Sequence, residues 1–265
     1  MTATIAARTS TRATSSDAVA TARRLTAMEL RLLLREPMVG VGLLGFPLVI
    51  VLVLAGVFGQ VPDPAFGGVA PDQHYLAGSI GVVIAAMGML TLPVHISTHR
   101  EVGVLRRFRA SGLSTGVVIA SQIAVGVILG TVAVAVVLLA GTAVYDLQTP
   151  VDPLGVLGWY VVGLACFIAI GVALGSVLST GRAATAVGNL IYVPMFMLGG
   201  GGPPRGAMTG AMSSISTVLP LSHIIGGIRL AWLGRTDDPH TLWWPILVAA
   251  VAVATAVRAE RRRAV

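Results

Sequence analysis

The chain has 265 residues, of which 55% are hydrophobic and only 11% charged, and its mean hydropathy is +0.87. Soluble domains carry about a quarter charged residues, so this composition excludes an ordinary soluble enzyme and predicts a polytopic membrane protein. The formal net charge is +7, and every basic residue is arginine. A phosphate-binding loop of the form G-x-x-x-x-G-K-[ST] is therefore excluded from these residues, because its lysine is missing.

The chain begins with a stretch rich in Ala, Thr and Ser, and residues 1–20 are predicted to form a disordered cytoplasmic tail. The following "TARRLTAMELRLLLREP" favours a helix that stops at Pro37. Arg24, Arg31 and Arg35 share one narrow stripe of this helix, opposite many leucines. The pattern predicts an interfacial helix on the cytoplasmic surface. The alternative is a helical extension of the first span.

Long apolar runs fill the rest of the chain, and about 20 apolar residues suffice for one crossing. We therefore expect an all-α transmembrane domain over residues 21–258, followed by a basic cytoplasmic tail at 259–265. The segment after "GGGGPPRG" is too interrupted to cross, so short helices dipping into the outer leaflet are expected there. The six predicted spans cover about 38–59, 75–97, 115–145, 154–178, 183–198 and 242–257.

Arginine is distributed unevenly over the predicted loops. All arginines but Arg205, Arg229 and Arg235 fall on one side of the membrane, together with both termini. The positive-inside rule then predicts that the two termini lie in the cytoplasm and that the protein crosses the cell membrane several times. Topology accounts for the basic charge, so no nucleic-acid partner is expected.

Few residues suggest catalysis. His95 and His99 have the spacing of a zinc-binding helix, but Ile96 stands where a zinc protease carries its glutamate base. Ser79 has no partner histidine within a span, and the lone Cys166 excludes a cysteine metal cluster. No metal or cofactor is expected in this chain. An intramembrane hydrolase using Ser79, His95 or His99, and a non-transporting membrane scaffold, are the alternative functions.

Polar residues inside the predicted spans are rare. No Asp or Glu lies in the middle of a crossing, which argues against ion coupling. Gln122 and Asn189 either hold helices together or line a pathway, and both interpretations stay open. The spacings Gly126–Gly130 and Gly171–Gly175 permit close helix contact.

The most charged stretch is "HREVGVLRRFRASGLS", residues 99–114, between the second and third predicted spans. Taken as a helix over 99–110, it places Val104, Leu105 and Phe108 on one apolar stripe, with arginines around the rest. Glu101 would lie in the first turn of this helix, where the helix dipole favours a negative charge. Such a helix suits docking into a groove of a partner, or the arginines merely fix topology.

This stretch resembles the first cytoplasmic loop of ABC-2 type transporter permeases, which carries R-E-x-G-T-L-x-R-L followed by Leu-Ser. Val104 replaces the threonine of that pattern, and Gly112 replaces a proline. "LLLREPMVGVGLLGFPLVIVLVLAGVFG" and "LPLSHIIGGIRLAWLG" resemble two further segments of the family, although "GGGGPPRG" departs from it. The matching loop positions are Arg100, Glu101, Gly103, Leu105, Arg107, Leu113 and Ser114.

The resemblance, which extends over residues 22–258, implies a six-span permease that is not itself an enzyme. Such permeases pair as identical or related copies and bind separate ATPase subunits, which hold ATP and Mg²⁺, at the cytoplasmic face. They export drugs, antibiotics, lipids or polysaccharides, and short forms are often drug or antibiotic exporters. The interfacial helix and the 98–114 loop would transmit ATPase closure. The implied coupling residues are Arg100, Glu101, Gly103, Val104, Leu105, Arg107 and Phe108.

Overall fold

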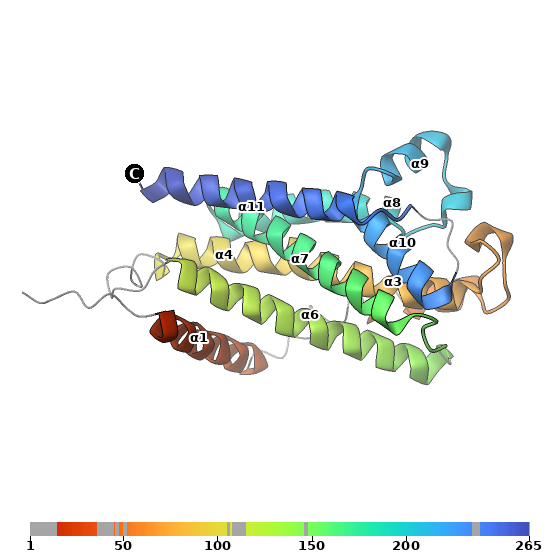
Figure 1. Ribbon diagram of the computed structural model, residues 1–265, viewed down its shortest axis with the longest axis horizontal. Helices are drawn as coiled ribbons and strands as arrows, with labels where there is room; N and C mark the ends of the chain where they lie inside the picture. The colour runs from red at the N-terminus through yellow and green to blue at the C-terminus, as the bar shows by residue number, and fades with distance from the viewer. Residues whose placement is uncertain are drawn as a thin grey trace, which may run out of the picture.

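The computed structural model describes residues 15–35, 45, 48–49, 52–104, 107, 115–145, 148–234 and 239–264. Within these ranges the regular elements are helical, and the single β-bridge joins Asp63 to Val69. The long helices run side by side along the longest axis of the molecule (Figure 1). The all-α prediction is confirmed for this part of the chain.

The first helix, α1, spans Ser15–Arg35 and packs against the first half of α6 (Thr115–Tyr145). The Thr26 hydroxyl faces α6 and lies 3.4 Å from the carbonyl oxygen of Ser121. Arg24, Arg31 and Arg35 are exposed, as the amphipathic pattern predicts. The prediction of a disordered tail is wrong for residues 15–20, which belong to α1, and residues 1–14 lie outside the described ranges.

The second predicted span is one continuous helix that is longer than expected at both ends. It consists of α3 (Pro71–Ala86), a π-helical turn η2 (Met87–Thr91) and α4 (Leu92–Glu101). The expected ends of the third and fourth spans agree within one residue with α6 and α7 (Pro153–Val177). Asp152 caps α7 by accepting a hydrogen bond from the backbone N–H of Gly155, at 2.9 Å.

The described residues contain four helices that are long and apolar enough to cross a membrane. These are Pro71–Glu101, α6, α7 and α11 (Trp243–Ala264), and α11 continues through the predicted basic tail. The helix α8 (Gly181–Leu198), predicted as the fifth span, is not among them, because Arg182, Asn189 and Pro194 dilute its apolar character. The prediction of six spans is therefore not confirmed, and most of 38–59 lies outside the described residues.

Short helices occupy the region between α8 and α11, as predicted. They are the 3-10 turn η3 (Arg205–Ala207), α9 (Gly210–Ser216) and α10 (Pro220–Leu233). The axes of α9 and α10 differ by 84°, so this pair forms either a broken fifth span or a re-entrant segment. Another 3-10 turn, η1 (Pro64–Phe66), lies at the same end of the bundle (Figure 1).

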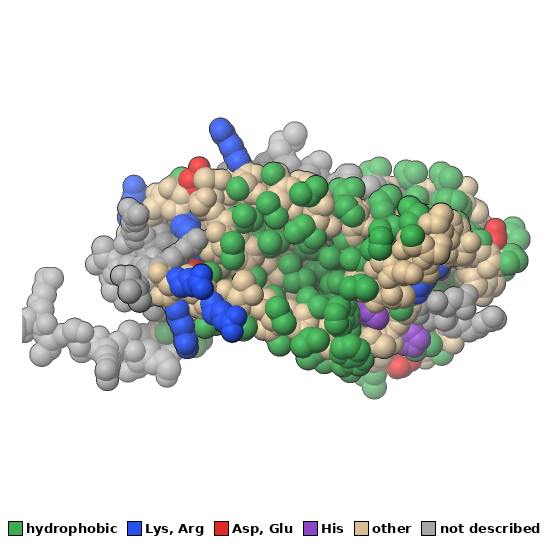
Figure 2. Space-filling view, turned by 90° about the horizontal axis from the view of Figure 1, so that it is seen from above, with side chains coloured by type: hydrophobic (Ala, Val, Ile, Leu, Met, Phe, Trp, Pro, Cys, Tyr) green, Lys and Arg blue, Asp and Glu red, His purple; other side chains and the backbone are tan. Residues whose placement is uncertain are grey.

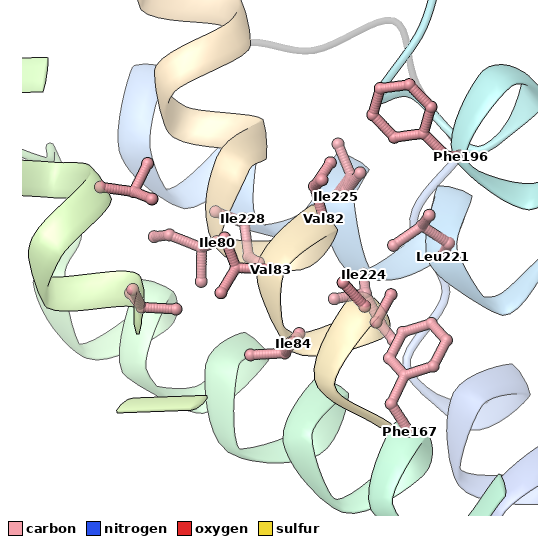
Figure 3. Close-up of a cluster of buried hydrophobic side chains, with 14 of the residues drawn as sticks. Ile80, Val82, Val83, Ile84, Phe167, Phe196, Leu221, Ile224, Ile225 and Ile228 are labelled. Carbon is pink, nitrogen blue, oxygen red and sulfur yellow. The ribbon is translucent and has the colours of Figure 1, made fainter. Parts of the chain in front are cut away.

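The main hydrophobic core surrounds α10. Its side chains interdigitate with those of α3, α7 and α8, as Figure 3 shows for Ile80, Phe167, Phe196 and Ile224. Leu221, Ile224, Ile225 and Ile228 are fully buried. Protein therefore surrounds α10, whereas most residues of α9 and the break at Thr217 and Val218 are exposed.

Glycines bring α7 against the π-helical turn. A Cβ on Gly171 would overlap with the carbonyl oxygen of Gly88, and one on Gly175 would lie 2.8 Å from Cβ of Ile96. Around Gly126 and Gly130 the nearest atoms are 3.9 and 3.5 Å away, which is ordinary contact. Of the two predicted close-packing motifs, only Gly171–Gly175 brings helices unusually near.

Several helix ends and arginines meet at one end of the bundle, which we call the arginine-rich end. It comprises α1, the ends of α4, α7 and α11, and the starts of α6 and α8 (Figure 1). Figure 2 shows arginine side chains gathered at this end and hydrophobic side chains over the middle of the face.

Candidate functional site at the arginine-rich end

Arg100 joins the end of α4 to two other helices. Its Nη1 donates to the carbonyl oxygens of Gly175 and Ser176, at 2.7 and 2.9 Å. Its Nη2 donates to Oε1 of Glu260 on α11, at 2.6 Å. The last carbonyls of a helix have no intrahelical partner, and the helix dipole favours a cation there. Arg100 therefore caps α7 and forms an ion pair with α11.

Glu101 acts on the next helix in the chain. Its Oε2 accepts a hydrogen bond from the backbone N–H of Gly181, at 2.9 Å, where α8 begins. The Thr180 side chain caps the same helix by accepting from the N–H of Ala183, at 3.2 Å. A carboxylate at a helix N-terminus is favoured by the helix dipole. The neighbouring Arg100 and Glu101 thus hold both sides of the turn between α7 and α8.

The single helix predicted over 99–110 is wrong, because α4 ends at Glu101. Gly103 has φ = +75°, a left-handed conformation that costs glycine little and other residues more. Helical structure resumes at Val104, and the N–H of Arg107 donates to the carbonyl oxygen of Gly103, at 3.2 Å. Glu101 is therefore the last residue of α4 rather than part of a first turn. Leu105 and Phe108 lie outside the described residues.

Glu29 of α1 makes a second connection at this end. Its Oε1 accepts from Nε2 of Gln122, at 3.0 Å, and lies 3.5 Å from Nε2 of His99. Gln122 is 3% exposed, so its amide joins α6 to α1 and acts in helix packing. Glu29 is not among the functional residues predicted from the sequence. A carboxylate on an otherwise apolar helix face was the signal that a partner lay opposite.

The structure separates Asn189 from Gln122. Asn189 is exposed on α8, and its Nδ2 donates to the carbonyl oxygen of Thr185 one turn earlier, at 2.8 Å. Its amide therefore does not hold α8 to another described helix of this chain. Gln122 therefore connects two helices, whereas the Asn189 side chain bonds within its own helix.

The residues of the alternative hydrolase do not assemble. Ser79 is 1% exposed, and its hydroxyl donates to the carbonyl oxygen of Leu76, at 2.5 Å. Ser79 and His95 lie on one continuous helix and are separated by roughly 24 Å along its axis. The rings of His95 and His99 are 6.5 Å apart, and no three His, Cys, Asp or Glu residues in the described ranges could hold a metal ion together.

The glycine-rich segment at the opposite end is held in place by side chains. Arg229 is 1% exposed, and its Nη2 donates to the carbonyl oxygen of Gly200, at 2.6 Å. Its Nε donates to the carbonyl oxygen of His74, at 3.1 Å, and the Tyr75 hydroxyl donates to that of Gly202, at 3.0 Å. Gly199–Gly202 are buried, so protein packs closely around this glycine-rich segment.

A comparison with models of known protein families identifies the family of this chain. The model of the family described as ABC-2 type transporter matches residues 22–233, from α1 to the end of α10. The chain belongs to the ABC-2 type transporter family. No curated protein matches the sequence.

The family resemblance read from the charged loop is thus confirmed. An ABC-2 membrane domain is the permease of a transporter rather than a catalytic subunit, and permeases of this kind work with ABC ATPase partners. The apolar helices agree with a membrane location for this permease. The Arg100–Glu101 pair lies within the matched residues, whereas its partner Glu260 lies beyond them.

Proposed function

We propose that this permease is the membrane subunit of an ATP-driven exporter that moves a hydrophobic or amphipathic compound out of the cytoplasm. A separate ABC ATPase subunit, which binds ATP and Mg²⁺, docks at the arginine-rich end. Two permease copies, identical or related, assemble in the cell membrane with both termini in the cytoplasm. Family membership supports this proposal, and so does the absence of lysine, which excludes a P-loop from these residues.

The observation that carries the proposal is the attachment of the charged loop to three helices. Arg100 and Glu101 lie at the end of α4, just before the bend at Val102 and Gly103, and they contact α7, α8 and α11 directly. A partner that displaces the loop after Gly103 would pull on the end of α4 and on the turn between α7 and α8 together. Charge-assisted hydrogen bonds suit this purpose because they are short and directional.

The amphipathic helix α1 provides a second attachment. Glu29 links it to His99 on α4 and to Gln122 on α6, so α1 touches the same end of the second span as the loop does. We therefore place the interfacial helix and the loop in one coupling unit. Arg24, Arg31 and Arg35 lie on the exposed side of α1, where they can face a partner or lipid headgroups.

The test is to co-purify the permease with an ABC ATPase subunit and to reconstitute both in proteoliposomes. A hydrophobic cationic dye and a fluorescent phospholipid serve as transport probes for the drug-like and lipid-like cargo classes. ATP-dependent movement of at least one probe, with stimulated ATP hydrolysis, is expected. Failure of any ATPase subunit to bind, or an unchanged hydrolysis rate on binding, would contradict the exporter assignment and favour a scaffold.

Two variants test the coupling residues within the same assay. Glu101→Ala removes one of the two side-chain caps of α8, and Phe108→Ala removes an apolar contact expected for the partner. Both should insert and bind the ATPase subunit yet lose transport. For Glu101→Ala the expected loss is roughly fivefold, since an N-terminal cap contributes about 1 kcal/mol. Thr185→Ala, on the exposed side of α8, is the matched control and should transport normally. Normal transport by both variants would remove the loop from the mechanism.

A further inference from the structure

A long apolar groove lies on the side of the bundle formed by α6, α7 and α11. Its volume is about 700 Å³, within the range of small-molecule sites. The helix α7 packs against both α6 and α11 and forms the floor, which includes Leu164, Ala165 and Ala169. Ile123 and Val127 of α6 form one wall, and residues of α11 form the other.

The groove has the length of an extended hydrocarbon chain. From Val161 to Ser176 its floor extends roughly 22 Å along α7. One leaflet of a bilayer contributes about 15 Å of hydrocarbon, half of the usual 30 Å. An acyl chain that starts at the arginine-rich end can therefore occupy most of the length of the groove.

Polar groups line only one end of the groove. Ser176, Glu260 and Arg261 lie there, at the ends of α7 and α11. The Glu260 carboxylate is paired with Arg100 at 2.6 Å, which offsets its charge. Arg261 is exposed, and Arg258 and Arg262 are exposed within one turn of it. The mouth of the groove is therefore positively charged.

We propose that this groove binds one acyl chain of an anionic phospholipid from the leaflet at the arginine-rich end, with the phosphate beside Arg261. Clusters of basic residues at the ends of membrane helices attract anionic headgroups. The lining of the groove is as apolar as the lipid tails, so it does not distinguish one phospholipid from another. The charge of the headgroup therefore determines which lipid binds. The bound lipid is distinct from any exported compound, so the proposal holds whether or not the permease is an exporter.

The test uses the full chain in vesicles of phosphatidylcholine. A photoactivatable phosphatidylglycerol with a diazirine in mid-chain is added at a few per cent, and cross-linked peptides are mapped by mass spectrometry. Labelling is expected within 161–172 and 253–257, and it should fall when unlabelled phosphatidylglycerol is added. Arg261→Gln should lower this labelling about fivefold, since one arginine near an anionic surface contributes about that factor. Arg182→Gln, an exposed arginine of α8 outside the groove, should leave it unchanged.

A second pair of variants separates the groove from the rest of α11. Val253 lines the groove and is 52% exposed, whereas Val251 is 58% exposed and does not line it. Val253→Trp should abolish labelling within 161–172, and Val251→Trp should not. Because both side chains are exposed, neither substitution disturbs a packed core. Equal labelling by a phosphatidylcholine analogue, or cross-links from the groove to a second copy of the chain, would overturn the proposal.

Discussion

Replacing Arg100 with glutamine is the sharpest test of how the charged loop is attached. The substitution keeps a polar side chain but removes the guanidinium that reaches three carbonyl oxygens and Glu260. Hydrogen bonds to a charged group contribute about 1.5–3 kcal/mol each when buried. The Arg100 and Glu260 side chains are 17% and 26% exposed, so water replaces part of this interaction.

The expected loss in the free energy of unfolding is therefore about 3 kcal/mol rather than the sum of all contacts. Unfolding in mixed detergent micelles, followed by tryptophan fluorescence, measures it. Arg24→Gln is the control, because Arg24 is exposed on α1 and should change stability by less than about 0.5 kcal/mol.

A double-mutant cycle with Glu260→Gln isolates the ion pair. A coupling energy of about 1 kcal/mol is expected, between the values for exposed pairs and for buried charge-assisted bonds. If Arg100→Gln were as stable as Arg24→Gln, or if the cycle gave no coupling, the reasoning from this geometry would be refuted.

Two further substitutions test packing at other places in the bundle. Gly171→Ala should destabilise the permease by about 2 kcal/mol, because the new methyl group overlaps with backbone of the π-helical turn. A Cβ on Gly126 would make only ordinary contact, 3.9 Å from Cδ1 of Leu92, so Gly126→Ala should be neutral or stabilising by up to about 1 kcal/mol; thermal unfolding in detergent compares the two variants. Equal effects of the two substitutions on stability would show that α7 does not approach the π-helical turn so closely. Arg229→Met removes a buried donor to Gly200, so limited proteolysis near 199–206 should become about tenfold faster. Unchanged proteolysis would mean that other contacts hold the segment.

Much of the helical arrangement could be predicted from local patterns. The apolar runs at 115–145 and 154–178 are long and end at turn or capping residues, so their boundaries agree with α6 and α7. Family membership also followed from the charged loop, since its residues keep a recognisable order. Predictions failed where a glycine changed the backbone, as at Gly103, and where helix continued beyond the apolar run, as in α11.

The sequence by itself determined that the chain is a helical membrane protein whose arginines gather at one end, because composition and periodicity are local properties. Only the tertiary structure decided what Arg100 and Glu101 do. Their partners lie 75 to 160 residues away along the chain. Most of these partners are backbone carbonyls and an amide, which every residue type carries, so no pattern of side chains marks them. Helix ends acquire such partners only when packing brings them beside the right side chain.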